Sequence, residues 1–175
     1  MRLRKQSVNS IFRFVLLTVL IASLSACGFK LRGAYQLPET LQKIYVQGST
    51  SSDLVKELKE ILGYSAVVVA KRSEASAVLN IIKEELERRT LSVDSRGKIR
   101  EAELQYSVIF SVIDSDGVLL LEKETVMLER DYIDDENDVI GRSNEAGIIT
   151  RDLKRDAAQR IVRRLQAIKP IVSAN

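Results

Sequence analysis

The sequence predicts an α+β fold: a two-layer sandwich of a mostly antiparallel four-stranded sheet with two helices on one face. Residues 102–113 alternate between an apolar set and a partly polar set, which is the period of a long strand with one buried face. Residues 48–63 and 143–170 instead carry apolar side chains every three or four positions, which is the period of amphipathic helices. The predicted order is strand, helix, further strands and a final helix.

The first 26 residues have the layout of a secretory signal peptide. A basic start with no acidic residue precedes an apolar stretch, 14–24, and the small residues Ser25 and Ala26 close it. A stable membrane span needs about 20 apolar residues, and this stretch is shorter and includes Thr18 and Ser23. We therefore interpret residues 1–26 as a cleaved targeting peptide rather than as an anchor.

The four residues Leu24-Ser25-Ala26-Cys27 resemble the bacterial lipobox. In such motifs the thiol receives a diacylglyceryl group, the peptide is cut before the cysteine, and the new amine is acylated. Several acyl chains at one residue give lasting membrane attachment, whereas one chain gives only marginal binding. Gly28 follows in place of the aspartate that marks retention at the inner membrane, so we expect the periplasmic face of the outer membrane. The alternative is an ordinary buried cysteine in a leader-like helix, and with one cysteine no disulfide can form within the chain.

The composition changes once the leader is removed. The remaining 149 residues carry 23 basic and 24 acidic side chains, a formal net charge of −1 instead of +3. Binding of nucleic acid or another polyanion through bulk charge is therefore not expected. The chain has no histidine and no cysteine besides Cys27, and these residues are the commonest catalytic bases and metal ligands. We expect no enzyme activity, no metal, and no cofactor beyond the covalent N-acyl and S-diacylglycerol lipid.

The mature chain is long enough for one domain. We predict an acylated start and extended linker over 27–40, a single domain over 41–169 and a tail over 170–175. Ile44 and Val46 indicate a short first strand. The following helix, 48–63, begins with a serine-rich N-cap region and Asp53 in its first turn, and Gly63 is placed as its C-cap.

The segment 78–93 is ambiguous. Residues 83–89 are strong helix formers, whereas Val78, Ile82 and Leu86 also fit the alternate faces of a strand. We predict a strand, with a helix as the alternative. A turn is expected at 94–98, followed by the long strand 102–113, a second turn at 114–117 and a hairpin partner over 118–131. An acidic loop, 133–138, then leads to the last helix, 143–170, which Pro170 ends.

The start of the mature chain, Cys27-Gly28-Phe29-Lys30-Leu31-Arg32-Gly33, resembles that of the LptE family of LPS-assembly lipoproteins. The Leu-Pro-x-Thr stretch 37–40, the long alternating strand at 102–105, the pair Asn144-Glu145 and the order of the elements also agree with this family. The resemblance implies a non-enzymatic outer-membrane lipoprotein that forms a 1:1 heterodimer with the LptD β-barrel. It would plug and support the barrel and bind lipopolysaccharide during transport and insertion into the outer leaflet.

The resemblance also implies that basic residues near the tips of the sheet bind lipopolysaccharide. By motif these are Arg96, in the turn before the long strand, and Arg142, just before the last helix, with Lys98 as a further candidate in the same turn. A guanidinium matches two phosphate oxygens with its planar fork, and lipid A carries phosphates. From the residues alone, all three also fit an ordinary solvated turn or helix start.

Five acidic residues at the end of the predicted hairpin and in the loop after it suggest a calcium loop at first sight: Asp131, Asp134, Asp135, Glu136 and Asp138. The spacing and the central glycine of an EF-hand are missing, so a solvated loop is the simpler interpretation. Contact with a basic patch of the barrel or with Arg142 is the alternative.

Two other classes of function remain open at this stage. The chain is also compatible with an auxiliary outer-membrane lipoprotein of another envelope export or efflux complex. A periplasmic hydrolase is weakly supported, because no Gly-x-Ser-x-Gly or Ser-x-x-Lys motif occurs in a useful context.

Overall fold

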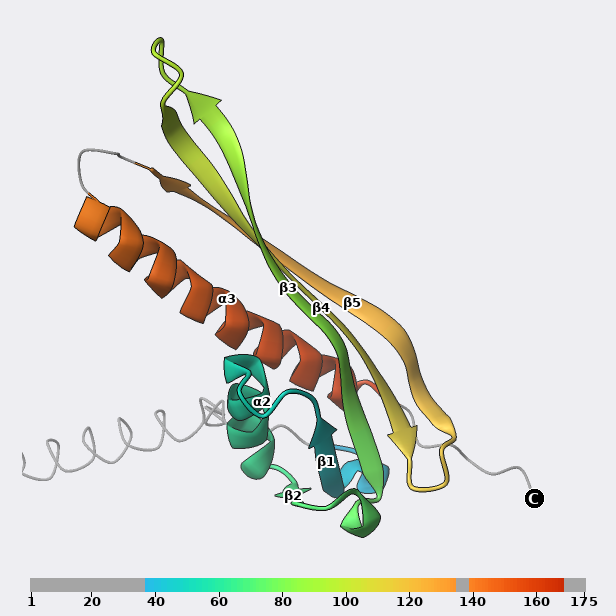
Figure 1. Ribbon diagram of the computed structural model, residues 1–175. Helices are drawn as coiled ribbons and strands as arrows, with labels where there is room; N and C mark the ends of the chain where they lie inside the picture. Colours follow the sequence, from blue (N-terminus) through green and yellow to red (C-terminus); the bar gives the residue numbers. More distant parts are fainter. Residues whose placement is uncertain (1–36, 135–138, 169–175) are drawn as a thin grey trace, which may run out of the picture. The chain divides into compact units, whose positions relative to one another are not determined.

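The computed structural model describes residues 37–134 and 139–168 (Figure 1). These residues fall within one compact unit, Ala34–Asn175. The predicted signal peptide, Cys27, most of the predicted linker and the predicted tail lie outside the described residues. In chain order the elements are η1 (Glu39–Leu41), β1 (Lys43–Gln47), α2 (Asp53–Gly63), β2 (Val67–Val68), η2 (Arg72–Glu74), β3 (Ala77–Val93), β4 (Ile99–Asp114), β5 (Leu119–Ile133) and α3 (Val139–Gln166).

The predicted α+β class is confirmed, and the sheet has five strands in the order β2-β1-β3-β4-β5. The prediction of four strands missed β2, which is only two residues long and pairs through Lys43 and Ile44 of β1. β1 runs parallel to both β2 and β3, whereas β3, β4 and β5 are antiparallel. The sheet is therefore mixed, and its antiparallel part forms the long three-stranded body seen in Figure 1.

Segment 78–93 is a strand, as predicted. β3 pairs with β4 from Ala77↔Asp114 to Val93↔Ile99, almost the full length of both strands. Backbone pairing with β4 and burial of Ala77 and Leu79 at one end outweigh the helix preference of residues 83–89. The turn predicted at 94–98 is also present, and Gly97 adopts φ 79°, which only glycine reaches without strain.

Helices α2 and α3 pack on the same face of the sheet and against each other. The predicted apolar face of β4 is the face that they cover, and Tyr106 and Phe110 are its largest fully buried side chains. Full burial of such a side chain contributes about 1.5–3 kcal/mol. The remaining helix-side residues of β4 are also buried: Ala102, Leu104, Val108 and Val112.

The ends of the helices differ in detail from the prediction. Ser52 caps α2 by accepting a hydrogen bond from the Val55 N–H (3.3 Å), but Gly63 is the last helical residue and Tyr64 is the C-cap. α3 begins at Val139, four residues before the predicted start at Ser143. Arg142 therefore lies inside the first turn of α3 rather than just before the helix. The 3-10 helix η1 also replaces the end of the stretch that was predicted to be extended.

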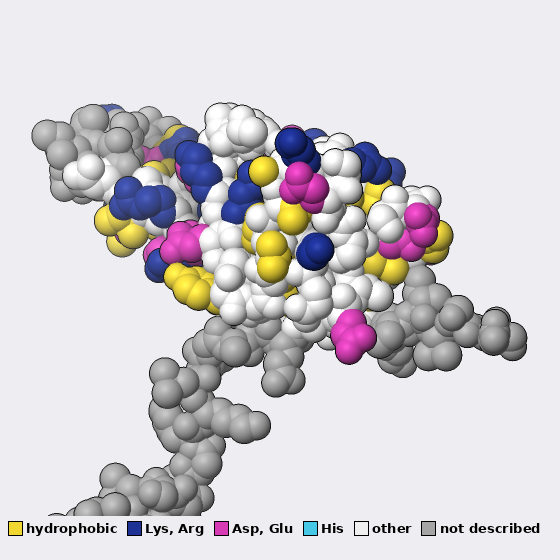
Figure 2. Space-filling model, turned by 90° about the horizontal axis from the view of Figure 1, so that it is seen from below, with side chains coloured by type: hydrophobic (Ala, Val, Ile, Leu, Met, Phe, Trp, Pro, Cys, Tyr) yellow, Lys and Arg dark blue, Asp and Glu magenta, His cyan; other side chains and the backbone are white. Residues whose placement is uncertain are grey.

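The surface mixes both signs of charge. Figure 2 looks at the end of the unit that carries β1, β2 and the β4–β5 turn, and basic, acidic and hydrophobic side chains are interspersed there. No helix among the described residues is long and apolar enough to cross a membrane. Within the same residues, no group of three or more His, Cys, Asp or Glu side chains is placed to hold a metal ion.

Candidate functional site

The candidate site is the distal end of the unit, where the β3–β4 turn, the end of β5 and the start of α3 gather (Figure 1). The chain enters the described unit at Leu37 and η1, beside β1 at the opposite end. Topology therefore brings Arg96 and Arg142, 46 positions apart in the sequence, to the same end of the molecule. The sequence analysis assigned both residues to one site, and their position at the same end of the unit is compatible with that prediction. The side chain of Arg142 lies outside the described part of the structure.

Asp94 organises the β3–β4 turn. One of its carboxylate oxygens, Oδ1, accepts hydrogen bonds from the backbone N–H groups of Arg96 (2.8 Å) and Lys98 (3.0 Å). The other, Oδ2, accepts from Nε (3.1 Å) and Nη2 (2.9 Å) of Arg96. The Lys98 N–H, followed by the Arg96 guanidinium, holds the pKa of the Asp94 carboxyl below its ordinary value of 3.8. Asp94 is therefore ionised at neutral pH and keeps the turn in one conformation.

Arg96 is exposed but not free of partners. Its side chain is 73% exposed at the tip of the hairpin and forms a local ion pair with Asp94. A phosphate at this position would compete with Asp94 for the guanidinium, while Nη1 has no partner among the described residues. The arrangement thus presents a fixed guanidinium that can still bind an anion on its open side. Lys98 in the same turn is also exposed and has contacts of its own.

A further arginine near the same end was not identified by the sequence analysis. Arg88 lies on the helix side of β3, where its Nε donates to the Tyr132 hydroxyl (2.7 Å) and its Nη2 pairs with the Asp134 carboxylate. The Asp134 side chain is only 1% exposed, whereas that of Arg88 is 42% exposed. The Asp134 N–H also donates to the Arg100 carbonyl (2.8 Å). This Arg88–Tyr132–Asp134 cluster ties the end of β5 to β3, across the intervening strand β4.

The cluster corrects the interpretation of the acidic segment as a solvated loop. Asp131 belongs to β5, and Asp134 is buried and paired with Arg88. Asp135, Glu136 and Asp138 lie outside the described residues. Little in the sequence indicated this pair. Arg88 is one of several charged residues in 83–89, and such a run of charges usually forms the solvent-exposed face of a helix or strand.

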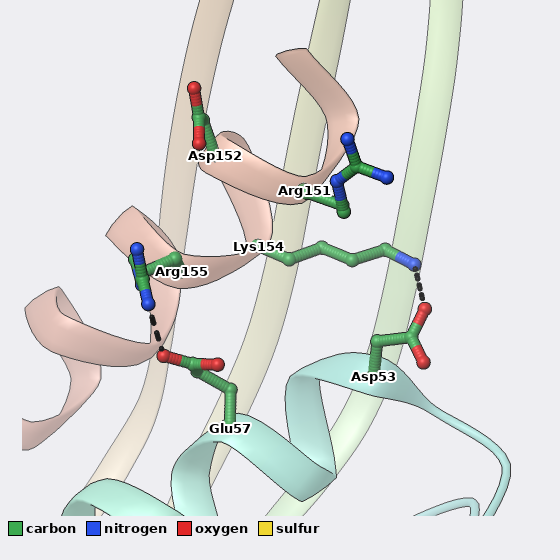
Figure 3. A pocket seen from close by; sticks show the side chains of 6 residues that line it. All are labelled: Asp53, Glu57, Arg151, Asp152, Lys154 and Arg155. Carbon is green, nitrogen blue, oxygen red and sulfur yellow. Dashed lines mark hydrogen bonds and ion pairs between the residues drawn. The ribbon is translucent and has the colours of Figure 1, made fainter. Parts of the chain in front are cut away.

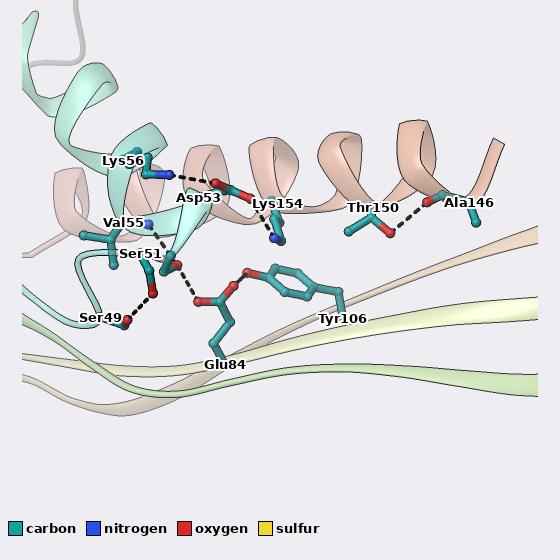
Figure 4. A network of polar contacts seen from close by, with 11 residues as sticks. Ser49, Ser51, Asp53, Val55, Lys56, Glu84, Tyr106, Ala146, Thr150 and Lys154 are labelled. Carbon is teal, nitrogen blue, oxygen red and sulfur yellow. Dashed lines mark hydrogen bonds and ion pairs between the residues drawn. The ribbon is translucent and has the colours of Figure 1, made fainter. Parts of the chain in front are cut away.

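A different polar network lies under the helices (Figure 4). Glu84 of β3 accepts a hydrogen bond from the Tyr106 hydroxyl (2.7 Å) and another from the Ser52 hydroxyl (2.6 Å) at the start of α2. Burial, and then the hydrogen bond to Glu84, raise the pKa of Tyr106 above its ordinary value. The phenol therefore remains a donor, and the network fixes the start of α2 on the sheet.

The hollow between α2 and α3 is lined by six charged side chains and has a volume of about 430 Å³ (Figure 3). Lys154 pairs with Asp53 (3.1 Å), and Arg155 pairs with Glu57 (3.4 Å). Lys56, and then Lys154, lower the pKa of Asp53 below its ordinary value of 3.8. Both carboxylates thus engage cations, and these ion pairs connect the two helices rather than presenting an acid–base pair to a substrate.

Comparison with known proteins agrees with the fold and with the sequence resemblance. The family model described as "LptE: Lipopolysaccharide-assembly" matches residues 41–165. The LPS-assembly lipoprotein LptE of Photorhabdus laumondii is 30% identical over 159 residues, which cover 88% of this chain and 85% of that protein. An LptE of Yersinia pestis is 25% identical, with 88% and 75% covered.

Solved structures of lipoproteins share the architecture. An uncharacterized lipoprotein B from Nitrosomonas europaea superposes with a TM-score of 0.68 at 27% identity, and 80% of this chain and 91% of that chain are covered. The rare lipoprotein B from Shewanella oneidensis gives a TM-score of 0.60 at 27% identity, with 71% and 94% covered. The fold, with its long hairpin and two helices on one sheet face, thus places the protein among small bacterial lipoproteins of α+β type. The chain belongs to the LptE family of lipopolysaccharide-assembly proteins.

Proposed function

We propose that this protein is an outer-membrane lipoprotein that plugs and supports the LptD β-barrel and binds lipopolysaccharide on its way to the outer leaflet. The match to the lipopolysaccharide-assembly family over residues 41–165 is the observation that carries this proposal. Relatives that cover most of the chain are named LPS-assembly lipoproteins. The lipobox-like sequence ending at Cys27 supports attachment by covalent lipid, and Gly28 supports the outer membrane.

The surface of the unit suits a water-filled barrel lumen. Large membrane barrels have polar interiors, and the mature chain combines near-zero net charge with many charged side chains of both signs. From Gly28 to Pro38 an extended chain spans at most about 35 Å, at ~3.3 Å per residue. The lipid would therefore keep the folded unit close to the bilayer, at the periplasmic mouth of the barrel. The end that carries the β3–β4 turn, opposite the chain entry, would then reach furthest into the lumen.

Co-purification tests the partnership. After gentle detergent extraction, a tagged protein should be recovered in a one-to-one complex with a large β-barrel, measured by native mass spectrometry. Recovery of the protein alone would contradict the proposal. Recovery with an inner-membrane transporter would instead support an auxiliary role in another export or efflux complex.

Charge reversal at the hairpin end tests lipid binding. The double variant Arg96→Asp/Arg142→Asp is expected to bind purified lipopolysaccharide at least about tenfold more weakly, because one lost charge-assisted contact is worth 1.4 kcal/mol or more. Binding can be measured by photocrosslinking or by microscale thermophoresis, and assembly with the barrel should persist. The matched control is Lys71→Asp/Arg72→Asp, which reverses two exposed charges at the opposite end. Equal loss in both double variants would assign the effect to net charge rather than to a site.

A further inference from the structure

The two hairpin turns, at opposite ends of the unit, have the same backbone conformation (Figure 1). Both turns, 94–98 and 114–118, begin with Asp-Ser and have glycine in the fourth position. In each, the N–H of the first residue donates to the carbonyl of the fifth (2.7 and 2.9 Å), and the glycine N–H donates to the carbonyl of the first (2.9 and 3.3 Å). Both glycines have a positive φ, 79° and 88°. The same turn thus occurs twice in the chain.

The aspartate in the first position closes both turns in the same way. Oδ1 of Asp94 accepts hydrogen bonds from the N–H groups of the third and fifth residues (2.8 and 3.0 Å). Oδ1 of Asp114 does the same, with the N–H groups of Asp116 (2.9 Å) and Val118 (2.8 Å). Aspartate and asparagine are common in turns because their side-chain oxygen can bond to the backbone two residues further on. One oxygen is therefore sufficient, and the turn does not require the second one.

The turns differ in the third position, where one has Arg96 and the other has Asp116. Oδ2 of Asp94 accepts from Nε (3.1 Å) and Nη2 (2.9 Å) of Arg96. Asp116 carries the same charge as Asp114, so no ion pair can link these two residues, and yet the backbone conformation is the same. The ion pair between Asp94 and Arg96 is therefore an addition to the turn rather than a requirement for it.

The ion pair occupies one of the two edges with which Arg96 can bind an anion. A guanidinium presents paired donors along its Nε–Nη2 edge and along its Nη1–Nη2 edge. Asp94 holds the first of these edges. A phosphate must either displace the Asp94 carboxylate from this edge or bind to the other edge, a few ångströms from a group of the same sign. In both cases the negative charge of Asp94 opposes the binding of the phosphate.

We propose that Asp94 competes with lipid phosphate for the Arg96 guanidinium and so keeps lipopolysaccharide binding at this end weak enough for release. This inference rests on the proposed function and adds a residue that sets the affinity of the same site. A protein on a transport route has to release each molecule that it binds. The Arg96 side chain is 73% exposed, and exposed ion pairs are weak. A phosphate can therefore exchange with Asp94, which lowers the affinity without closing the site.

The opposite role for Asp94 would be to hold the guanidinium in place for the phosphate. The geometry favours competition, because Asp94 uses a paired-donor edge that a phosphate would also use. The backbone that carries Arg96 is already held by Oδ1 of Asp94 and by the hydrogen bonds within the turn. The two roles predict changes of opposite sign when the charge of Asp94 is removed.

Asp94→Asn tests the competition in the full mature protein. The asparagine oxygen can accept from the two turn N–H groups, whereas its NH₂ group cannot accept from the guanidinium. Purified lipopolysaccharide in detergent should bind about threefold more tightly or better and dissociate more slowly, because an exposed ion pair and a neighbouring like charge each change an equilibrium by a factor of a few. Microscale thermophoresis measures the affinity. Asp94→Ser, a second neutral variant that can also accept from the turn, should change binding in the same direction.

The second turn provides the matched control. Asp114→Asn removes the same charge from the same position of the same turn at the opposite end, and it should leave lipid binding unchanged. In an Arg96→Ala background, Asp94→Asn should give no gain, since the two residues are expected to act as a pair. Hydrogen exchange at the amides of Arg96 and Lys98 shows whether the turn is intact in each neutral variant of Asp94.

Unchanged or weaker binding in a neutral Asp94 variant with an intact turn would overturn the inference while the proposed function stands. An equal gain in Asp114→Asn would assign the effect to net charge, and a gain that persists in the Arg96→Ala background would separate it from the guanidinium. Loss of the turn in both neutral variants would show that the turn needs the carboxylate. Each of these three results also contradicts the inference. Wild-type binding in Arg96→Ala alone would instead count against the proposed lipid site.

Discussion

Replacing Cys27 with alanine is expected to remove the protein from the membrane without unfolding it. The lipobox-like residues 24–27 predict that this thiol and the amine created by cleavage carry the acyl chains. Two or more chains give lasting attachment, at about 0.8 kcal/mol for each buried CH₂ group. Without them the described unit has no helix able to span a membrane. When the barrel partner is depleted, we expect nearly all of the wild-type protein, and almost none of the variant, in the outer-membrane fraction.

Separate measurements test whether the variant folds and to which membrane the lipoprotein is sorted. Residues 27–175 with Cys27→Ala, produced without the leader, should give the circular dichroism spectrum and melting temperature of the wild-type chain. Gly28→Asp is the matched control, because it should keep the lipid and change only the destination, to the inner membrane. An unfolded Cys27→Ala variant, or one that stays in the outer membrane when the barrel partner is depleted, would contradict the assignment of the lipid to this residue.

Arg88→Ala is expected to cost about 2–3 kcal/mol of the free energy of unfolding. The substitution removes the guanidinium that pairs with the buried carboxylate of Asp134 and the donor to the Tyr132 hydroxyl. A buried charge that loses its partner retains its desolvation penalty, which makes the loss larger than for a surface pair. Urea denaturation measures the change, and hydrogen exchange should show faster opening at the end of β5.

The neighbouring residue provides the control for this prediction. Arg89 also pairs with an acidic side chain, Glu87, but at 3.6 Å and with both partners more than half exposed. Exposed ion pairs contribute about 0–1 kcal/mol, so Arg89→Ala should leave the midpoint of unfolding almost unchanged. Equal losses in the two variants would mean that the Arg88 cluster is no more than surface charge.

Local patterns were sufficient for most of the elements. The alternation of residues 102–113 and the turn at 114–117 predicted the β4–β5 hairpin, and the apolar stripe of α2 predicted its buried face, including Leu54 and Leu58. These predictions succeeded because a strand or helix at a protein surface repeats its burial with a fixed period. β2 was missed because two residues are too few to show a period.

The sequence alone did not predict which residues far apart in the chain form pairs. Nothing near Arg88 in the sequence indicates that it meets Asp134, because the two residues come together only when β3, β4 and β5 align in one register. The start of α3 was also misplaced, by four residues. The acidic segment before it resembles a solvated loop, whereas Asp134 is drawn into the protein by a partner from another strand.

The sequence alone predicted the lipid-modified cysteine, the α+β class and the family resemblance. These predictions were possible because targeting motifs and the periodicity of buried residues are local properties of the chain. Only the tertiary structure decided that β1 stops beside Asn80, so that among the described residues no strand pairs with the rest of that edge of β3. The geometry is compatible with a glycine at the exit from the sheet, since a Cβ at Gly48 would lie 2.9 Å from Cγ2 of Val55. An open edge of this kind follows from which strands lie side by side, and no stretch of sequence carries that information alone.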